Sequence, residues 1–142
     1  MKKTIFLLAI LAVLVTACST NSTGDTVAEI EYFSIPISDI SEDISKYTYD
    51  YNGVGITYFA VLGSDGEIRT AFDGCEVCGG TKGYTQEGED IVCVNCGRTF
   101  SIDDLGTKNV AGGCWPMDLD HKVEGDYVLV SKADLESKAY MF

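Results

Sequence analysis

The chain has 142 residues, enough for one ordinary domain, and it carries 10 lysine and arginine residues against 22 aspartate and glutamate residues. The formal net charge of −12 argues against a nucleic-acid partner, because phosphate binding needs clustered basic side chains. Hydrophobic residues make up 46%, which is sufficient for a core, so the feature that needs an explanation is the presence of 6 cysteines in so short a chain.

Residues 1–17 have the pattern of a bacterial lipoprotein signal peptide. Two lysines near the start precede the uninterrupted apolar run 5–15, which is too short to span a bilayer as a helix. The run ends in VTAC, which resembles the lipobox whose cysteine is acylated and becomes the new N-terminus. Cys18 is therefore the expected lipidation site; the alternative is an ordinary signal peptide followed by a spare cysteine.

Lipidation would place the protein in the cell envelope, on the extracytoplasmic side of a membrane. Cleavage would remove two lysines and change the net charge from −12 to −14, so membrane attachment would depend on the acyl chains and not on basic residues. The polar segment 18–28 is expected to be a flexible tether, and 29–142 the folded domain. Five cysteines then remain in that domain, and an odd number cannot all be paired in disulfides.

The first half of the domain is predicted to consist of strands and tight turns. Residues 29–37 mix β-branched and aromatic side chains, although Pro36 excludes a central position in a sheet, and 38–46 form a loop or a short helix. Tyrosines alternate with polar residues over 47–51, an Asn-Gly turn follows, and 54–62 is an apolar strand. An Asp-Gly turn then leads into a strand over 67–72.

The second half is predicted to contain one more hairpin, a final strand and very little helix. Residues 84–86 and 91–94 flank a Glu-Gly-Glu-Asp turn, and Ser101 is expected to cap one helical turn through 105. Residues 126–130 form the last strand, and Ser131 begins a short terminal helix. The fold class is mainly β, with a small α+β fold as the variant, built from short antiparallel strands and glycine-rich loops.

Two cysteine pairs have the spacing of a metal site. Cys75 and Cys78 are followed by Cys93 and Cys96 in the pattern C-x2-C-x14-C-x2-C, and a glycine comes directly after each pair. A C-x2-C-G turn directs both sulfur atoms inward, and the glycine permits the tight turn. Two such turns, joined by a hairpin, place four thiolates in a nearly tetrahedral arrangement that suits iron, an iron–sulfur cluster, zinc or copper(I).

Other uses of these four cysteines remain open. Two disulfides are the main alternative in an oxidising compartment. A covalent haem is disfavoured because no histidine follows either pair, and a thioredoxin-like site is disfavoured because Gly79-Gly80 is a poor start for a helix. The metal-centre hypothesis therefore has an alternative, which is a structural zinc ribbon or a disulfide-stapled domain that binds a partner.

The fifth cysteine of the domain, Cys114, lies in the glycine-rich segment GGCWP. It is a candidate fifth ligand, a partner thiol or an unligated cysteine. Met117 and His121 follow closely, so a soft copper site is conceivable, but a single histidine among charged neighbours is usually a solvated surface residue. A thiol oxidoreductase that uses Cys114 with one of the pairs is a further hypothesis.

The segment from Ala71 to Leu119 resembles the FtrD-like family of membrane-associated, iron–sulfur-containing proteins, and the similarity extends from about Ile30 to the C-terminus. The matching motifs are Asp73, Cys75, Cys78, Gly83-Tyr84, Gln86-Glu87-Gly88, Cys93, Cys96, Gly106-Thr107 and Gly112-Gly113-Cys114. Trp115 and Met117 depart from the family's usual residues, whereas all the cysteines are kept.

The resemblance implies an extracytoplasmic metal-binding module that serves iron uptake and electron transfer. Many members carry this domain after several membrane spans, whereas a lipid anchor is expected here. The leading hypothesis is therefore a lipid-anchored binding module, not an enzyme, that holds an iron or iron–sulfur centre beside an iron permease or another redox protein.

Overall fold

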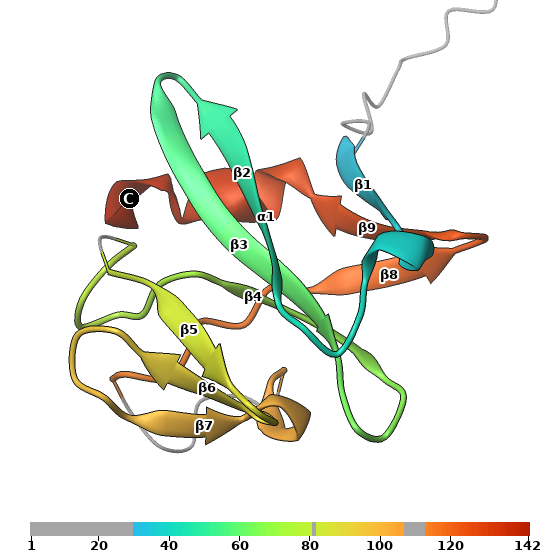
Figure 1. Ribbon diagram of the computed structural model, residues 1–142. Coiled ribbons are helices and arrows are strands. Elements are labelled where there is room, and N and C mark those ends of the chain that lie inside the picture. The colour runs from blue at the N-terminus through green and yellow to red at the C-terminus, as the bar shows by residue number, and fades with distance from the viewer. Residues whose placement is uncertain (1–29, 81, 107–112) are drawn as a thin grey trace, which may run out of the picture.

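The computed structural model describes residues 30–80, 82–106 and 113–142, and these residues form a mainly β fold (Figure 1). Their strands are arranged in three antiparallel sheets with the orders β2-β3-β4, β1-β9-β8 and β5-β6-β7. The predicted fold class is confirmed. The predictions about the signal peptide, Cys18 and the tether concern residues outside this described part.

The β2-β3-β4 sheet is the centre of the fold and follows the predicted pattern closely. It comprises β2 (Ser45–Tyr51), β3 (Val54–Leu62) and β4 (Ile68–Phe72). Asn52 and Gly53 join β2 to β3 with φ angles of 53° and 83°, the left-handed pair that a two-residue hairpin turn needs. The predicted alternation in β2 is confirmed, because its tyrosines all lie on the half-buried face and the polar residues between them are exposed.

Strand β3 separates two hydrophobic cores, which explains its continuous apolar sequence. Phe59 and Val61 lie in the core that also contains two of the cysteines, whereas Ile56, Tyr58 and Ala60 lie in the other core. Every residue from Tyr58 to Val61 is fully buried. The strand is therefore covered on both faces, and the cysteine-rich half of the molecule shares it with the rest.

The β1-β9-β8 sheet covers the second core. It comprises β1 (Tyr32–Pro36), β8 (His121–Glu124) and β9 (Tyr127–Ser131), and Pro36 lies at the end of an edge strand as expected. The hydroxyl of Ser131 accepts a hydrogen bond from the Asp134 backbone N–H, which confirms the predicted cap of α1 (Lys132–Ser137). Strand β8 was not predicted, because its sequence HKVE lacks an apolar alternation.

The β5-β6-β7 sheet lies at one end of the molecule and carries the second cysteine pair (Figure 1). The predicted hairpin is present as β5 (Tyr84–Glu87) and β6 (Asp90–Cys93), and β7 (Thr99–Ser101) adds a third strand that was not predicted. The helical turn after Ser101 is the 3-10 helix η2 (Ile102–Asp104), but the Ser101 side chain makes no capping hydrogen bond. The prediction of a cap at Ser101 was therefore wrong.

Two further 3-10 turns complete the described elements. The segment 38–46 is predicted as a loop or a short helix. The 3-10 helix η1 (Ile37–Asp39) covers its first two residues, whereas its last two belong to β2. The 3-10 helix η3 (Ala139–Met141) lies near the end of the chain. None of the helices in the described residues is long and apolar enough to cross a membrane.

Candidate metal centre

The first cysteine pair forms a tight knuckle at the end of β4. The Gly79 N–H donates to the Cys75 carbonyl at 2.8 Å, and the Cys78 N–H points at the Cys75 sulfur at 3.3 Å. Gly79 has φ = 63°, a conformation that a residue with a side chain rarely adopts. The glycine after the pair is therefore required by the turn, as the motif predicts.

The second pair repeats this geometry after β6. The Gly97 N–H donates to the Cys93 carbonyl at 2.8 Å, and Gly97 has φ = 69°. The backbone N–H of Arg98 donates to the Cys96 sulfur, and this bond, together with one from Cys93, lowers the pKa of the Cys96 thiol. Backbone amides thus stabilise the charged form of a sulfur, which is the form that binds a metal.

The hairpin between the pairs brings the two knuckles together. Tyr84 at the start of β5 pairs with Cys93 at the end of β6, and the Val94 N–H donates to the Gly83 carbonyl at 3.1 Å. The Asn95 side chain then reaches across, because its Nδ2 lies 3.1 Å from the Cys78 sulfur. Asn95 was not singled out from the sequence, since only the fold shows that its side chain reaches the other pair.

The five described cysteines are all unpaired thiols and form a connected cluster. Cys78 interacts with Cys75 and Cys93, and Cys114 interacts with Cys96, Cys75 and Cys78. The hydrogen bond to Cys96, followed by burial, raises the pKa of Cys114 to about 11. Burial is the main reason why the pKa of Cys78 is also raised.

Burial differs within each pair in the same way. Cys75 and Cys93 are only 1% and 2% exposed and belong to the core beneath the cluster, whereas Cys78 is half-buried and Cys96 is exposed. Within the described residues, no three His, Cys, Asp or Glu side chains are grouped closely enough to hold a metal ion as they stand. Because the first cysteine of each pair is fixed in the core, we expect Cys78 and Cys96 to make most of the movement that ligation needs.

The donor set nevertheless fits a thiolate-bound metal. Two rigid turns supply four sulfur atoms, and two of these sulfur atoms accept a hydrogen bond from a backbone N–H. None of the four forms a disulfide in the described part of the chain. Thiolate sulfur is the ligand type of iron–sulfur clusters, mononuclear iron and structural zinc.

An ion pair between the buried carboxylate of Asp73 and the exposed side chain of Lys46 supports the hairpin from the side of β2. The Lys46 Nζ lies 2.7 Å from Asp73 Oδ2 and also donates to the Tyr84 carbonyl at 2.7 Å, while Asp73 Oδ1 accepts the Tyr84 N–H at 2.7 Å. Gly83 packs directly on the carboxylate, since a Cβ there would lie 2.6 Å from an Asp73 oxygen. The motif included Asp73 and Tyr84, but Lys46 is distant in sequence and was not predicted.

The C-terminus packs against the first knuckle. The Gly80 N–H donates to the Met141 carbonyl at 2.8 Å, and a Cβ on Gly80 would overlap the Phe142 ring. That ring also packs against Phe72 with a centroid separation of 6.2 Å. In Figure 1 the C-terminal end accordingly lies beside the connection between β4 and β5.

Met117 and His121 do not join the cysteine cluster. Met117 packs against the second core, and His121 lies on β8 with its Nδ1 3.0 Å from the Thr70 hydroxyl. His121 is half-buried rather than fully solvated, and burial lowers its pKa below the usual value. Both residues therefore lie outside the cluster of five cysteines.

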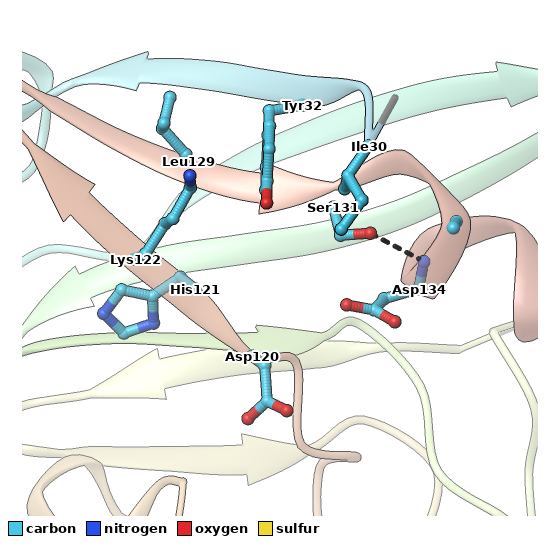
Figure 2. Close-up of a pocket in the computed structure, with 9 residues that line it drawn as sticks. Ile30, Tyr32, Asp120, His121, Lys122, Leu129, Ser131 and Asp134 are labelled. Atoms are coloured by element: carbon cyan, nitrogen blue, oxygen red, sulfur yellow. Dashed lines mark hydrogen bonds between the residues drawn. The ribbon is translucent and has the colours of Figure 1, made fainter. Parts of the chain in front are cut away.

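Figure 2 shows the surroundings of His121, a pocket of about 360 Å³ between β8, β9 and the start of α1. Its polar atoms are largely engaged: Ser131 bonds the Asp134 backbone, and the Lys122 ammonium lies 4.1 Å from the centre of the Tyr32 ring. The pocket contains none of the cysteines.

One comparison with known proteins found a match, and it covers most of the described chain. A family model described as membrane iron-sulfur containing protein FtrD-like matches residues 40–142, which includes both knuckles and Cys114. No curated protein and no solved structure matches the chain.

Proposed function

Since the chain belongs to the FtrD-like family of membrane iron-sulfur containing proteins, we propose that Cys75, Cys78, Cys93 and Cys96 hold an iron or iron–sulfur centre. The protein would use this centre for electron transfer or for iron uptake and delivery. The observation that carries the proposal is the pair of C-x2-C-G turns, which the β5–β6 hairpin brings side by side with N–H groups directed at sulfur.

The surroundings of the sulfur atoms favour a redox role. An iron centre exchanges single electrons, and its potential depends on hydrogen bonds to the sulfur atoms and on solvent exposure. Here Cys75 and Cys93 are buried while Cys96 is exposed. One edge of the centre would thus be reachable by a partner protein, while the opposite edge stays in the hydrophobic core.

Attachment to the membrane is proposed to occur through Cys18. The apolar run 5–15 and the VTAC sequence support an acylated cysteine, and the tether 18–28 would hold the domain near the outer surface of the membrane. A membrane-bound iron permease or redox protein is the partner that this location suits.

The test is anaerobic purification followed by elemental analysis, acid-labile sulfide analysis and visible absorption. We expect a stoichiometric iron centre, with replacement of Cys75, Cys78, Cys93 or Cys96 by serine lowering the iron content severalfold. Cys114→Ser is the matched control, because it removes a thiol from the same cluster but leaves both knuckles intact, and it should retain the iron.

Three other outcomes would contradict this function, and each would support a different one. Stoichiometric zinc without a redox wave would indicate a structural zinc ribbon. A colourless, metal-free protein with two disulfides would indicate a stapled binding domain. A metal-free protein whose Cys114 is alkylated faster than denatured thiol controls would indicate a thiol oxidoreductase.

A further inference from the structure

We propose that Tyr84 is a positioning residue, whose buried hydroxyl fixes residues 113–116, called here the Cys114 segment, against the four cysteines of the two knuckles. This inference rests on the proposed function of that cluster and adds to it. It assigns to one side chain the placement of the fifth thiol, which belongs to neither knuckle.

The first observation is the contact that the hydroxyl makes. Tyr84 is 2% exposed, and its hydroxyl donates a hydrogen bond to the Cys114 carbonyl at 2.8 Å. The same phenol group interacts with the Cys75 sulfur and lies in the electrostatic field of Cys93 and Cys114. One side chain therefore touches the first knuckle and the Cys114 segment, while its backbone pairs with the second knuckle.

The second observation is that the backbone of Tyr84 is fixed by charged groups. Its N–H donates to Asp73 and its carbonyl accepts from Lys46, both at 2.7 Å, and the two charged side chains are also 2.7 Å apart. Hydrogen bonds to charged groups are stronger than neutral ones, so this end of the strand has little freedom. The phenol oxygen is thus held in a defined place.

The third observation is that aromatic packing fixes the ring and extends to Trp115. The centroid of the Tyr84 ring lies 6.5 Å from that of Phe59 and 6.3 Å from that of Phe100. The ring centroids of Phe100 and Trp115 are 4.7 Å apart. The segment after the glycines is consequently held twice, by the Cys114 carbonyl and by the neighbouring indole. Both contacts lead back to Tyr84, directly or through one ring.

The consequence concerns the Cys114 thiol, which donates to Cys96. Without the hydroxyl, the Cys114 carbonyl would lose its buried donor, and the segment would open more often. The sulfur of Cys75 would also lose a neighbouring polar group, which changes the electron density on a ligand of the centre. Tyr84 would therefore influence both the placement of Cys114 and the properties of the bound metal.

The test compares Tyr84→Phe with Tyr58→Phe. Both tyrosines are buried, but the Tyr58 hydroxyl has no hydrogen-bond partner among the described residues, so its removal breaks no bond. In the reduced, metal-free protein, mass spectrometry would measure the alkylation rate of Cys114 relative to Cys96. We expect Tyr84→Phe to raise this ratio about fivefold, the factor that the loss of one net hydrogen bond produces, and Tyr58→Phe to leave it unchanged.

A second variant and a second readout make the test independent of folding and of metal binding. Lys46→Met removes the hydrogen bond to the Tyr84 carbonyl and so loosens the start of β5 without changing the Tyr84 ring. It should also raise the alkylation ratio, and it replaces Tyr84→Phe in the test if that variant does not fold. In the iron-loaded protein, Tyr84→Phe should shift the midpoint potential and the sulfur-to-iron absorption bands, and Tyr58→Phe should not. An unchanged alkylation ratio in both variants would overturn the proposal, whereas absence of iron would contradict only the function proposed above.

Discussion

Asp73 is a charged residue that is buried in the described part of the chain. Its carboxylate side chain is only 9% exposed and receives hydrogen bonds from the Lys46 ammonium and the Tyr84 backbone. A buried charge is tolerated only when its partners are in place, so each of them matters more than a surface partner does. This arrangement connects β2 to the hairpin between the knuckles.

Replacing Lys46 by methionine should therefore destabilise the protein by about 2 kcal/mol, because Asp73 would keep only one of its two hydrogen-bond partners. Lys132→Met is the control, since Lys132 pairs with the exposed Glu31 at a similar distance of 2.8 Å. A surface pair of that kind contributes less than about 1 kcal/mol. Urea unfolding of both variants measures the difference. Equal losses in the free energy of unfolding would show that the Asp73 pair stabilises the fold no more than a surface pair does.

His121 provides a pH-dependent prediction at the same scale. Burial lowers its pKa, while the nearby Asp120 and Asp118 partly oppose the shift. The folded protein therefore favours the neutral imidazole more strongly than the unfolded chain does. The free energy of unfolding should fall as the pH decreases from the ordinary histidine pKa of about 6.5 through the lower folded-state pKa.

The measurement is denaturant unfolding between about pH 7.5 and about pH 5, with His121→Asn as the comparison. Asparagine can still bond the Thr70 hydroxyl but does not titrate, so the variant should lose less stability on acidification than the wild type. Parallel pH profiles for the two proteins would assign the acid sensitivity to the carboxylates instead.

Among the elements, the first knuckle depends on a distant part of the chain. Gly79 and Gly80 lie against the last residues, where Met141 accepts a backbone hydrogen bond and Phe142 occupies the space next to Gly80. The turn is thus closed by η3 and not by its own sequence alone. Packing of this kind restricts how far Cys78 can move from Cys75.

Gly80→Ala should destabilise the protein by about 1–3 kcal/mol, because the added methyl overlaps the Phe142 ring. Gly55→Ala is a suitable control: its φ is also not positive, and its Cβ would meet Thr48 at an ordinary contact distance of 3.4 Å. That change should be neutral or stabilising by up to about 1 kcal/mol.

Thermal or urea unfolding would compare these variants with Phe142→Ala and with the Gly80→Ala/Phe142→Ala double variant. If the ring is the cause, adding Gly80→Ala to Phe142→Ala should cost little further stability. Full additivity of the two changes would show that the C-terminus does not close the knuckle.

The predicted elements succeeded where a local signal was strong. The alternation of tyrosines, the Asn-Gly turn and the apolar run defined β2 and β3, and Ser131 correctly marked the start of α1. Strands β7 and β8 are short and have no clear alternation, so only their pairing with β6 and β9 creates them. At Ser101 the residue type fits a cap, but the backbone enters a 3-10 turn without using the side chain.

At the scale of the whole molecule, the cysteine spacing leads to the prediction of a four-cysteine centre, which stays a prediction, but it does not indicate what surrounds these residues. The motif predicts the turn in each knuckle, since the hydrogen bond from the glycine N–H to the carbonyl of the first cysteine is local, but it does not predict the packing of the C-terminus on the first knuckle. The contacts of Lys46, Tyr84 and Phe142 join segments that are far apart in the chain, and no local pattern contains such information. The role of Cys114 does not follow from the sequence for the same reason, because its place beside Cys96 depends on the fold.

The β5-β6-β7 sheet and strand β3, which contributes residues to both hydrophobic cores, join the two knuckles to the rest of the fold. The core beneath the knuckles contains Cys75 and Cys93 as members, so the centre and the hydrophobic core are built from the same residues. Binding of a metal should therefore stabilise the fold as well as supply chemistry.

Native mass spectrometry of the anaerobically purified protein tests the four-cysteine centre most directly, because it weighs the bound group and reports the redox state of the thiols together. We predict one dominant species whose excess mass over the polypeptide equals a single iron or iron–sulfur centre, lost when Cys93 is replaced by serine and retained with Cys114→Ser. A species with the mass of the polypeptide alone, or lighter by the hydrogens of two disulfides, would contradict it.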